Sequence, residues 1–424
     1  MQCCDRGIPQ YEDERLVVKQ PKAALGFIFI SVFLDVLSFG VIIPVLLYLL
    51  EDMLNGDTAL ATRYLGVFGT AWALMQFVCA PIMGSLSDRF GRRPVLLLSS
   101  FGLGIDYILM AVAPSVGWLF LGRMLSGITA ASFSTAGAYI ADITPPEKRA
   151  ASYGIFGAAF GLGFVIGPAL GGWLGSYGLR VPFWVSAALT LTNALYGLFI
   201  LPESLSKEKR QAFSWSRANP IGSLILLRSQ PGLFGLAMIG FLYQLAHQVL
   251  QNVFVPYSKF RFDWSPKVVG LSLGAVGVCS IIVQGALVRP LIRKLGERRM
   301  LLTALSFGIA GFLWFGCSLH QNAMWMGILV LAGMGFFSPA WQGLMTRRVS
   351  HSEQGQLQGA GGSLAGIAGM VGPTLFTSIF SSVTPFGKDS IALGAPFFLA
   401  AGMLGIGLSL AIFVTRPQAT EPNA

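Results

Sequence analysis

The sequence predicts an all-α integral membrane protein with twelve transmembrane helices in two pseudo-symmetric six-helix bundles. Three observations lead to this prediction: an apolar composition, long stretches without charge, and a repeat between the two halves. Hydrophobic residues make up 54% of the 424 residues and charged residues only 11%, whereas a soluble domain carries about 25% charged residues. So few charges cannot cover a water-facing surface, and most side chains must therefore face lipid or other helices.

The predicted helices follow from the gaps between charged residues, because a spanning helix needs about 20 mostly apolar residues. Residues 23–50, which contain only Asp35, fit one span. Residues 94–141 and 300–346 are each long enough for two spans, divided near 113–115 and 318–322. Seven further stretches without charge complete the twelve, at residues 64–87, 150–179, 181–202, 229–258, 268–288, 354–387 and 390–415.

The distribution of Lys and Arg predicts the orientation, since cytoplasmic segments carry an excess of both. With both termini inside, 22 of the 29 Lys and Arg residues fall in inner segments, 6 in outer segments and Arg123 within a span. The first apolar run is too long for a cleavable signal and should remain as an anchor. No Asn-x-Ser/Thr sequon occurs, which favours a bacterial source. We expect a protein of the bacterial inner membrane with both termini in the cytoplasm.

These spans define five regions of the chain. They are a cytoplasmic tail (1–23), a first six-helix bundle (24–202), a cytoplasmic linker (203–230), a second six-helix bundle (231–415) and a second cytoplasmic tail (416–424). The two bundles repeat each other at a single offset of 205 residues, which aligns Gly91 with Gly296, Gly154 with Gly359, and Gly167-Pro168 with Gly372-Pro373. Parallel repeats of this kind are related by an axis along the membrane normal and place a substrate path between the halves.

The connection after the second span, residues 84–93, combines glycines with a dense set of charges. Gly91 permits a tight turn, and Asp88 stands among three arginines, so we expect a charge network at the inner mouth. Such a network can hold one conformation and break in another. A simple basic anchoring loop would explain the arginines but not the spacing of the other residues. The predicted gate comprises Gly84, Asp88, Arg89, Gly91, Arg92, Arg93, Asp142 and Arg149.

This loop resembles the signature G-x-x-x-D-R-x-G-R-R of the major facilitator superfamily. The fifth span resembles the antiporter motif of the same superfamily, G-x(8)-G-x(3)-G-P-x(2)-G-G, with Gly154, Gly163, Gly167, Pro168, Gly171 and Gly172 at the matching positions. From about residue 24 to 415 the chain is similar to the tetracycline–proton antiporters, in segments such as 35–44, 104–107, 141–144 and 261–264. The resemblance implies the major facilitator fold, drug efflux that confers antibiotic resistance, and a proton gradient as energy source without a cofactor.

The resemblance leaves the substrate open between a tetracycline-like compound and a broader set of small amphiphilic drugs. Ser280 and Gly308 stand where well-known tetracycline exporters carry a His in the eighth span and an Asp in the ninth.

Two carboxylates lie well inside the predicted spans, Asp35 in the first and Asp106 in the third. An ionisable residue within the membrane is costly and is retained mainly for function. We expect Asp35, Asp106 and Arg123 to form the proton-coupling site. A purely structural ion pair with Arg123 is the alternative, and either Asp could be its partner.

The seventh span carries a polar stripe, with Gln244, Gln248 and Gln251 at helical spacing and His247 beside them. A polar stripe on a spanning helix should face a cavity rather than lipid, although hydrogen bonding between helices explains any single Gln equally well. The predicted substrate-binding residues are Gln76, Gln244, His247, Gln248, Gln251, Gln284, Trp341 and Gln342.

Other functional classes lack their sequence signals. No nucleotide-binding loop, metal-ligand cluster or catalytic Ser-His-Asp arrangement is present, so we expect neither an enzyme nor a metal site. The net charge of +10 falls in short clusters between apolar runs, which does not suit nucleic acid. The expected partners are a small-molecule substrate, protons and the lipid bilayer, and a monomer should suffice. The alternatives are an importer or uniporter of a small metabolite, and a non-transporting receptor or scaffold on the same fold.

Overall fold

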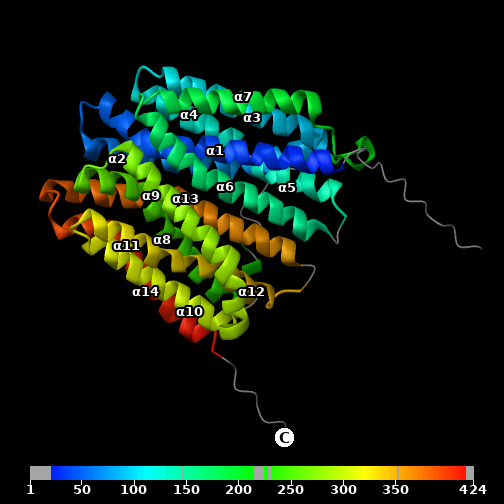
Figure 1. Cartoon of the computed structure of the whole chain (residues 1–424). Coiled ribbons are helices and arrows are strands. Elements are labelled where there is room, and N and C mark those ends of the chain that lie inside the picture. The colour runs from blue at the N-terminus through cyan, green and yellow to red at the C-terminus, as the bar shows by residue number, and fades with distance from the viewer. Residues whose placement is uncertain are drawn as a thin grey trace, which may run out of the picture.

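The computed structural model describes residues 21–130, 132–145, 148–213, 224, 226–227, 231–350 and 353–416. Most of the two predicted tails and residues 214–223 of the predicted linker lie outside the described residues. Within the described residues every regular element is a helix and no strand occurs (Figure 1). Helices satisfy all backbone hydrogen bonds internally, which a chain in lipid requires.

The first half of the chain forms seven α-helices. They are α1 (Pro21–Met53), α2 (Thr58–Phe90), α3 (Arg92–Val112), α4 (Val116–Thr129), α5 (Ser132–Ile143), α6 (Arg149–Gly175) and α7 (Val181–Ile200). The fourth span consists of α4 and α5 together. The predicted division near residues 113–115 is confirmed.

The second half forms seven further α-helices and a short π-helical segment. They are α8 (Pro231–Phe262), α9 (Pro266–Ile282), the π-helical η4 (Val283–Leu287), α10 (Val288–Cys317), α11 (Gln321–Ala332), α12 (Phe337–Thr346), α13 (Gln354–Val383) and α14 (Ala395–Val414). The tenth span joins α11 and α12 through the 3-10 turn η5 (Gly333–Phe336).

Eleven helical runs of the described chain are long and apolar enough to cross a membrane. One of them, Pro266–Cys317, has 52 residues and would be about 78 Å long as one helix. The hydrocarbon core is only about 30 Å thick, so this run must contain two spans. Gly296 breaks it with a non-helical backbone (φ 74°, ψ 162°). The predicted twelve transmembrane helices are thereby confirmed.

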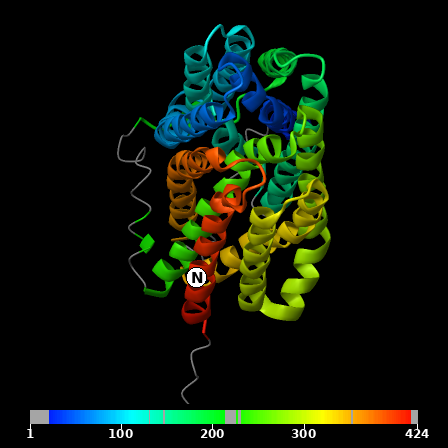
Figure 2. The ribbon, with the colours of Figure 1, turned by 90° about the vertical axis from the view of Figure 1, so that its left-hand side faces the viewer.

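The connections at one end of the helices contain more Lys and Arg residues than those at the other end. We call this end the basic end; it carries the α2–α3, α5–α6 and α12–α13 connections and the turn at Gly296. We call the other end of the helices the opposite end. The helices of the first half, α1–α7, fill the upper part of Figure 1, and α8–α14 fill the lower part (Figures 1 and 2). The sequence predicts that the basic end faces the cytoplasm.

Within the first bundle, α6 packs directly on the backbone of α1. A side chain on Gly167 would come within 2.8 Å of the Gly40 Cα atom, and one on Gly171 would overlap the Val41 carbonyl group. Gly163 lies in the same way on Val36. Small residues at these positions let the two helices approach closely, which supplies the van der Waals contact that holds helices together in lipid.

The two bundles touch at the opposite end. There α6 meets α9, where the Cα atom of Gly270 would be 3.0 Å from a Cβ atom on Gly172. In the second contact α2 meets α13, where the Thr70 hydroxyl donates to the Met370 carbonyl oxygen (2.8 Å) and Ser381 donates to the Ala59 carbonyl oxygen (2.9 Å). These contacts close the opposite end.

The same helix faces are separated at the basic end. A Cβ atom on Gly84, Gly154, Gly157, Gly285 or Gly362 would have no neighbour within 4 Å. Gly154 and Gly157 lie on α6 nearer the basic end than the residues that meet α9, and both are exposed. The molecule is therefore closed at the opposite end and open at the basic end.

We expect Gly171→Ala to destabilise the protein by about 1–3 kcal/mol, because the added methyl group would overlap the backbone of α1, which cannot move aside cheaply. Gly157→Ala on the same helix is the matched control, since its methyl group meets no neighbour. Thermal unfolding of the purified protein in detergent measures both. Equal melting temperatures for the two variants would contradict the α1–α6 packing described here.

Candidate functional site

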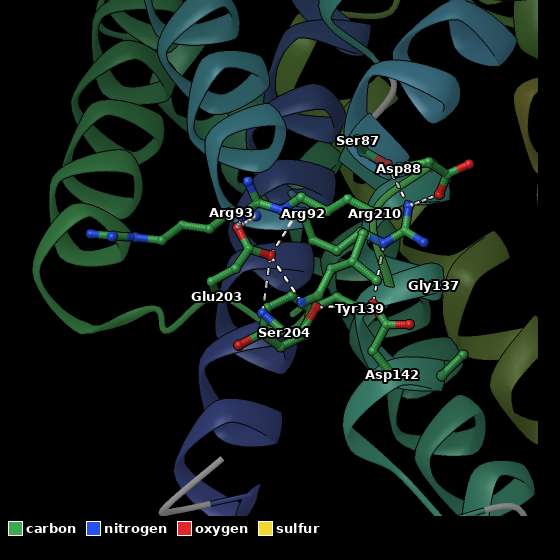
Figure 3. Close-up of polar contacts among 12 residues, drawn as sticks. Ser87, Asp88, Arg92, Arg93, Gly137, Tyr139, Asp142, Glu203, Ser204 and Arg210 are labelled. Atoms are coloured by element: carbon green, nitrogen blue, oxygen red, sulfur yellow. Dashed lines mark hydrogen bonds and ion pairs between the residues drawn. The ribbon is translucent and has the colours of Figure 1, made fainter. Parts of the chain in front are cut away.

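The predicted gate at the basic end centres on the side chain of Arg92. Its Nη1 atom lies 2.6 Å from Asp88 Oδ1 and donates to the Ser87 hydroxyl (2.6 Å). Its Nε atom donates to Asp142 Oδ2 (3.2 Å). One guanidinium group thus joins the end of α2 to the end of α5, as Figure 3 shows, and Arg92 itself begins α3.

Glu203, just after α7, is a part of this cluster that the sequence analysis did not identify. Its carboxylate accepts hydrogen bonds from the backbone N–H groups of Arg92 (2.8 Å) and Arg93 (3.3 Å), and from those of Ser204 (3.0 Å) and Leu205 (3.1 Å). A negative charge at a helix N-terminus satisfies free N–H groups and complements the helix dipole. Glu203 therefore fixes the start of α3 from 111 residues away.

Gly91 makes this arrangement possible. Its backbone has φ 109° and ψ 160°, which a residue with a side chain rarely adopts. A Cβ atom here would also overlap the Glu203 carboxylate. The glycine expected to form a tight turn thus serves two purposes, because it turns the chain and leaves room for the carboxylate.

The remaining predicted gate residues have other partners. Arg93 donates to the Leu198 carbonyl oxygen (2.6 Å) at the end of α7, and Arg89 lies over the Phe90 ring at 5.1 Å. Arg149 donates to the carbonyl oxygens of Thr144 and Ala141 at the end of α5 (3.2 and 3.0 Å). Arg149 therefore stabilises the C-terminus of α5 beside Asp142, where a cation is favourable.

The second candidate site is the buried pair of Asp106 and Arg123. Arg123 Nη2 lies 3.4 Å from Asp106 Oδ2 and 3.3 Å from the Ser126 hydroxyl, and the two charged side chains are 0% and 8% exposed. Gly122 leaves the space for Asp106, because a Cβ atom there would come within 2.6 Å of Asp106 Oδ1. The sequence left open which Asp pairs with Arg123, and the structure assigns Asp106.

Asp35 lies elsewhere in the same bundle. It is 5% exposed and lines a small cavity between α1, α3, α5 and α7. Ser31, Ser100 and Asn193 line the same cavity, and Ser31 donates to Asn193 Oδ1 (2.9 Å). The two carboxylates therefore occupy different settings, one in an ion pair and one beside a largely apolar cavity.

The glycines of the fifth span serve both bundles. Gly163, Gly167 and Gly171 pack on α1, whereas Gly172 packs on α9. Gly154 borders open space. This face of α6 therefore lies between a fixed contact inside its bundle and a second contact across the molecule.

The predicted polar stripe on α8 is divided between two settings. Gln248 packs against α13, because a Cβ atom on Gly372 would come within 2.5 Å of the Gln248 Cβ atom. The Gln248 side chain also accepts a hydrogen bond from Asn252 (3.2 Å). His247 lies beside the Tyr243 ring, with centroids 6.0 Å apart. Gln244 and Gln251 are exposed. Part of the stripe thus holds helices together, and part remains accessible.

The other predicted substrate-binding residues come from three helical segments. Trp341 on α12 donates to the Leu236 carbonyl oxygen (2.8 Å) and packs on Gly240, so its indole ring joins α12 to α8. Gln342 is exposed beside it, Gln284 is exposed on η4, and Gln76 is half-buried on α2. Their role in binding stays a prediction.

No group of three metal-ligating side chains occurs among the residues that the structure describes.

Comparisons with known proteins identify relatives over most of the chain. The sequence model of the Major Facilitator Superfamily matches residues 28–373 and 253–424. The class C tetracycline resistance protein of Escherichia coli is 38% identical over 377 residues, which cover 89% of this chain and 94% of that protein. The human organic anion transporter MFSD10 (TETRAN) has a similar structure, with a TM-score of 0.68 and 25% identity over 92% of this chain and 99% of that one.

A second solved structure supports the fold alone. It is a bacterial homolog of the human lysosomal transporter Spinster, in an inward-facing and unoccupied conformation. Its TM-score is 0.74 with 16% identity, over 94% of this chain and 97% of that one.

We expect Glu203→Ala to lower the stability of the first bundle by about 1–3 kcal/mol, because the backbone N–H groups at the start of α3 lose their acceptor. Hydrogen–deuterium exchange at Arg92 and Arg93 should become faster than in the unmodified protein. Glu208→Ala serves as the control, since Glu208 is exposed in the same segment. Unchanged exchange in Glu203→Ala would show that the carboxylate does not fix α3.

Proposed function

Because the chain belongs to the Major Facilitator Superfamily and to its group of tetracycline resistance proteins, it is a transporter and not an enzyme, and we propose that it exports a small amphiphilic, tetracycline-like or multidrug substrate in exchange for protons. The moving units are the two bundles, residues 24–202 and 231–415. The protein lies in the cell membrane of a bacterium, with the basic end and both termini in the cytoplasm. The proton gradient is its only energy source.

The observation that carries this proposal is the difference between the two ends of the molecule. The glycine-lined contacts between α6 and α9 hold the opposite end closed, while the same helices stand apart at the basic end. A transporter that works by alternating access needs two such states, one open to each side. The present conformation corresponds to the state that receives substrate from the cytoplasm.

The buried pair of Asp106 and Arg123 supplies a way to couple protons to this change. A proton on Asp106 would cancel its charge and leave Arg123 as a buried cation without a counterion. Removing one partner of a buried pair costs about 3–5 kcal/mol, so protonation favours a conformation in which Arg123 finds new partners. Asp35 beside its cavity gives a second place where a proton can bind.

The energy available is sufficient for export. One proton that moves inward releases about 2.3 kcal/mol per 100 mV of membrane potential and about 1.4 kcal/mol per pH unit. Since the predicted spans of the second half contain no Asp or Glu, the first bundle carries the coupling.

The substrate site lies at the opening between the bundles. The exposed Gln244, Gln251, Gln284 and Gln342 make no hydrogen bond to any described residue, so their amides are available to a ligand. Amides suit a neutral or zwitterionic polar compound, because they donate and accept without carrying charge. Ser280 and Gly308 stand where the tetracycline exporters carry a His and an Asp. The absence of these two ionisable groups favours a substrate that is bound with fewer charged contacts.

We expect Asp106→Asn and Asp35→Asn each to lower pH-driven drug uptake into everted membrane vesicles by about tenfold or more at normal expression, since an amide cannot exchange the proton that a carboxylate within the membrane is retained to carry. The assay imposes a pH gradient and compares uptake with and without an uncoupler over a panel of amphiphilic drugs. Asp52→Asn, at the exposed end of α1, is the control. Full, uncoupler-sensitive uptake in both variants would overturn the proton sites.

A further inference from the structure

Four charged positions of the basic end repeat between the two halves with inverted sign. At the offset of 205 residues that aligns the glycines, four charged positions of the first half match four charged positions of the second. Asp88, Arg92, Asp142 and Lys148 correspond to Arg293, Glu297, Arg347 and Glu353. Gly91 is copied unchanged as Gly296, and Arg89 and Arg93 match Lys294 and Arg298 with the same sign, so the inversion concerns these four positions.

The structure repeats the arrangement as well as the spacing. In the first bundle Arg92 Nε lies 3.2 Å from Asp142 Oδ2, and in the second Arg347 Nη2 lies 2.9 Å from Glu297 Oε1. Gly91 and Gly296 directly precede Arg92 and Glu297, and both have positive φ angles of 109° and 74°. Each bundle therefore carries the same ion pair with its two charges exchanged.

The contacts at the opposite end show which segments face each other across the molecule. Along α6 and α9, Gly172 faces Gly270 and Ala169 faces Gly274. Residue numbers decrease along α6 as they increase along α9, so the two helices are antiparallel. When this register is continued to the basic end, the start of α6 at residues 148–149 faces residues 293–297.

The contact between α2 and α13 follows the same rule. Thr70 faces Thr374 (2.8 Å between their hydroxyl oxygens), and Gly366 faces Phe77. Continued to the basic end, this register brings residues 88–92 opposite the start of α13 near Glu353. Both pairs of segments are apart in the present conformation, and no ion pair recorded for the described residues joins the two bundles.

We propose that Lys148 pairs with Glu297, and Arg92 with Glu353, when the basic end closes. Lys148, Glu297 and Glu353 are then positioning residues of the transport cycle, which deepens the proposed function and rests on its alternating access. Lys148 is exposed in the open state, and Glu297 Oε2 is buried without a partner. Glu297 Oε1 pairs with Arg347 within the second bundle, so its other carboxylate oxygen is the one available to Lys148.

The inversion has a physical reason. Because the pseudo-symmetry axis relates the two bundles, the two cross-bundle contacts are equivalent. Each joins the position of Arg92 or its equivalent in one bundle to the position of Lys148 or its equivalent in the other bundle. In the first half these positions hold two cations, Arg92 and Lys148. If the second half had copied them, both contacts would bring like charges together and oppose closure. Inverted charges make both contacts attractive.

Three neighbouring cations donate hydrogen bonds within their own bundle. Arg93 donates to the Leu198 carbonyl oxygen, Arg298 to the Thr415 hydroxyl and Arg348 to the Val414 carbonyl oxygen. Each contacts the last helix of its own bundle or the residue after it.

The test measures conformation rather than export. Spin labels on Phe90→Cys and Leu295→Cys, exposed equivalent positions of the two bundles, report by electron–electron distance how often the basic end closes in lipid nanodiscs between pH 5 and 8. The background lacks the five native cysteines. Lys148→Glu and Glu297→Lys should each lower the closed population by about fourfold, as expected for loss of a surface ion pair. The double variant should restore it.

The direction of the effect is the decisive result. The basic end is net positive, so a non-specific effect of charge predicts that Lys148→Glu promotes closure, whereas the pair predicts that it promotes opening. Closure promoted by Lys148→Glu, additive losses in the double variant, or no closed population in the parent protein would each overturn the proposal. Thermal melting confirms that the variants fold. If the pairs behave as expected but vesicles show no export, the proposed function fails while the pairs stand.

Discussion

The close approach of the two bundles at the opposite end is the contact on which the rest of the structure depends. Without Cβ atoms at Gly172 and Gly270, the α6 and α9 backbones touch, and this contact spans only part of their length. In lipid there is little hydrophobic force between helices, so close van der Waals packing decides where they join. Because the contact is confined to one end, the other end is free to open.

Charge is handled differently inside and outside the membrane. At the basic end, Arg92 and Glu203 act through helix termini and short ion pairs that water can screen and exchange. Inside the first bundle, Asp106 and Arg123 have each other and Ser126 as partners among the described residues, so in the proposed mechanism a change in the charge of Asp106 is answered by movement. The surface charges are therefore suited to select a conformation, and the buried pair is suited to drive the change.

The fold was largely predictable from the sequence, whereas the pairing of side chains was not. Charge-free stretches found all twelve spans, although α1 continues through Glu51 and Asp52 because charges are tolerated near helix ends. Isolated charges also revealed Asp106 and Arg123, but not their contact, since Asp35 lay in an equivalent sequence setting. Glu203 escaped notice because it is distant in sequence from the helix it stabilises and belongs to no motif. The glycine repeat was visible, and its role in two different contacts required the structure.

A disulfide across the α6–α9 contact tests the central claim most directly. A Cβ atom on Gly274 would lie 3.4 Å from that of Ala169, close to the separation of about 3.5–4.5 Å in disulfides. Ala169→Cys with Gly274→Cys, in a background without native cysteines, should cross-link on oxidation, abolish uptake into everted vesicles and recover on reduction. Undiminished uptake by fully cross-linked protein would contradict the claim that the bundles must separate at this end.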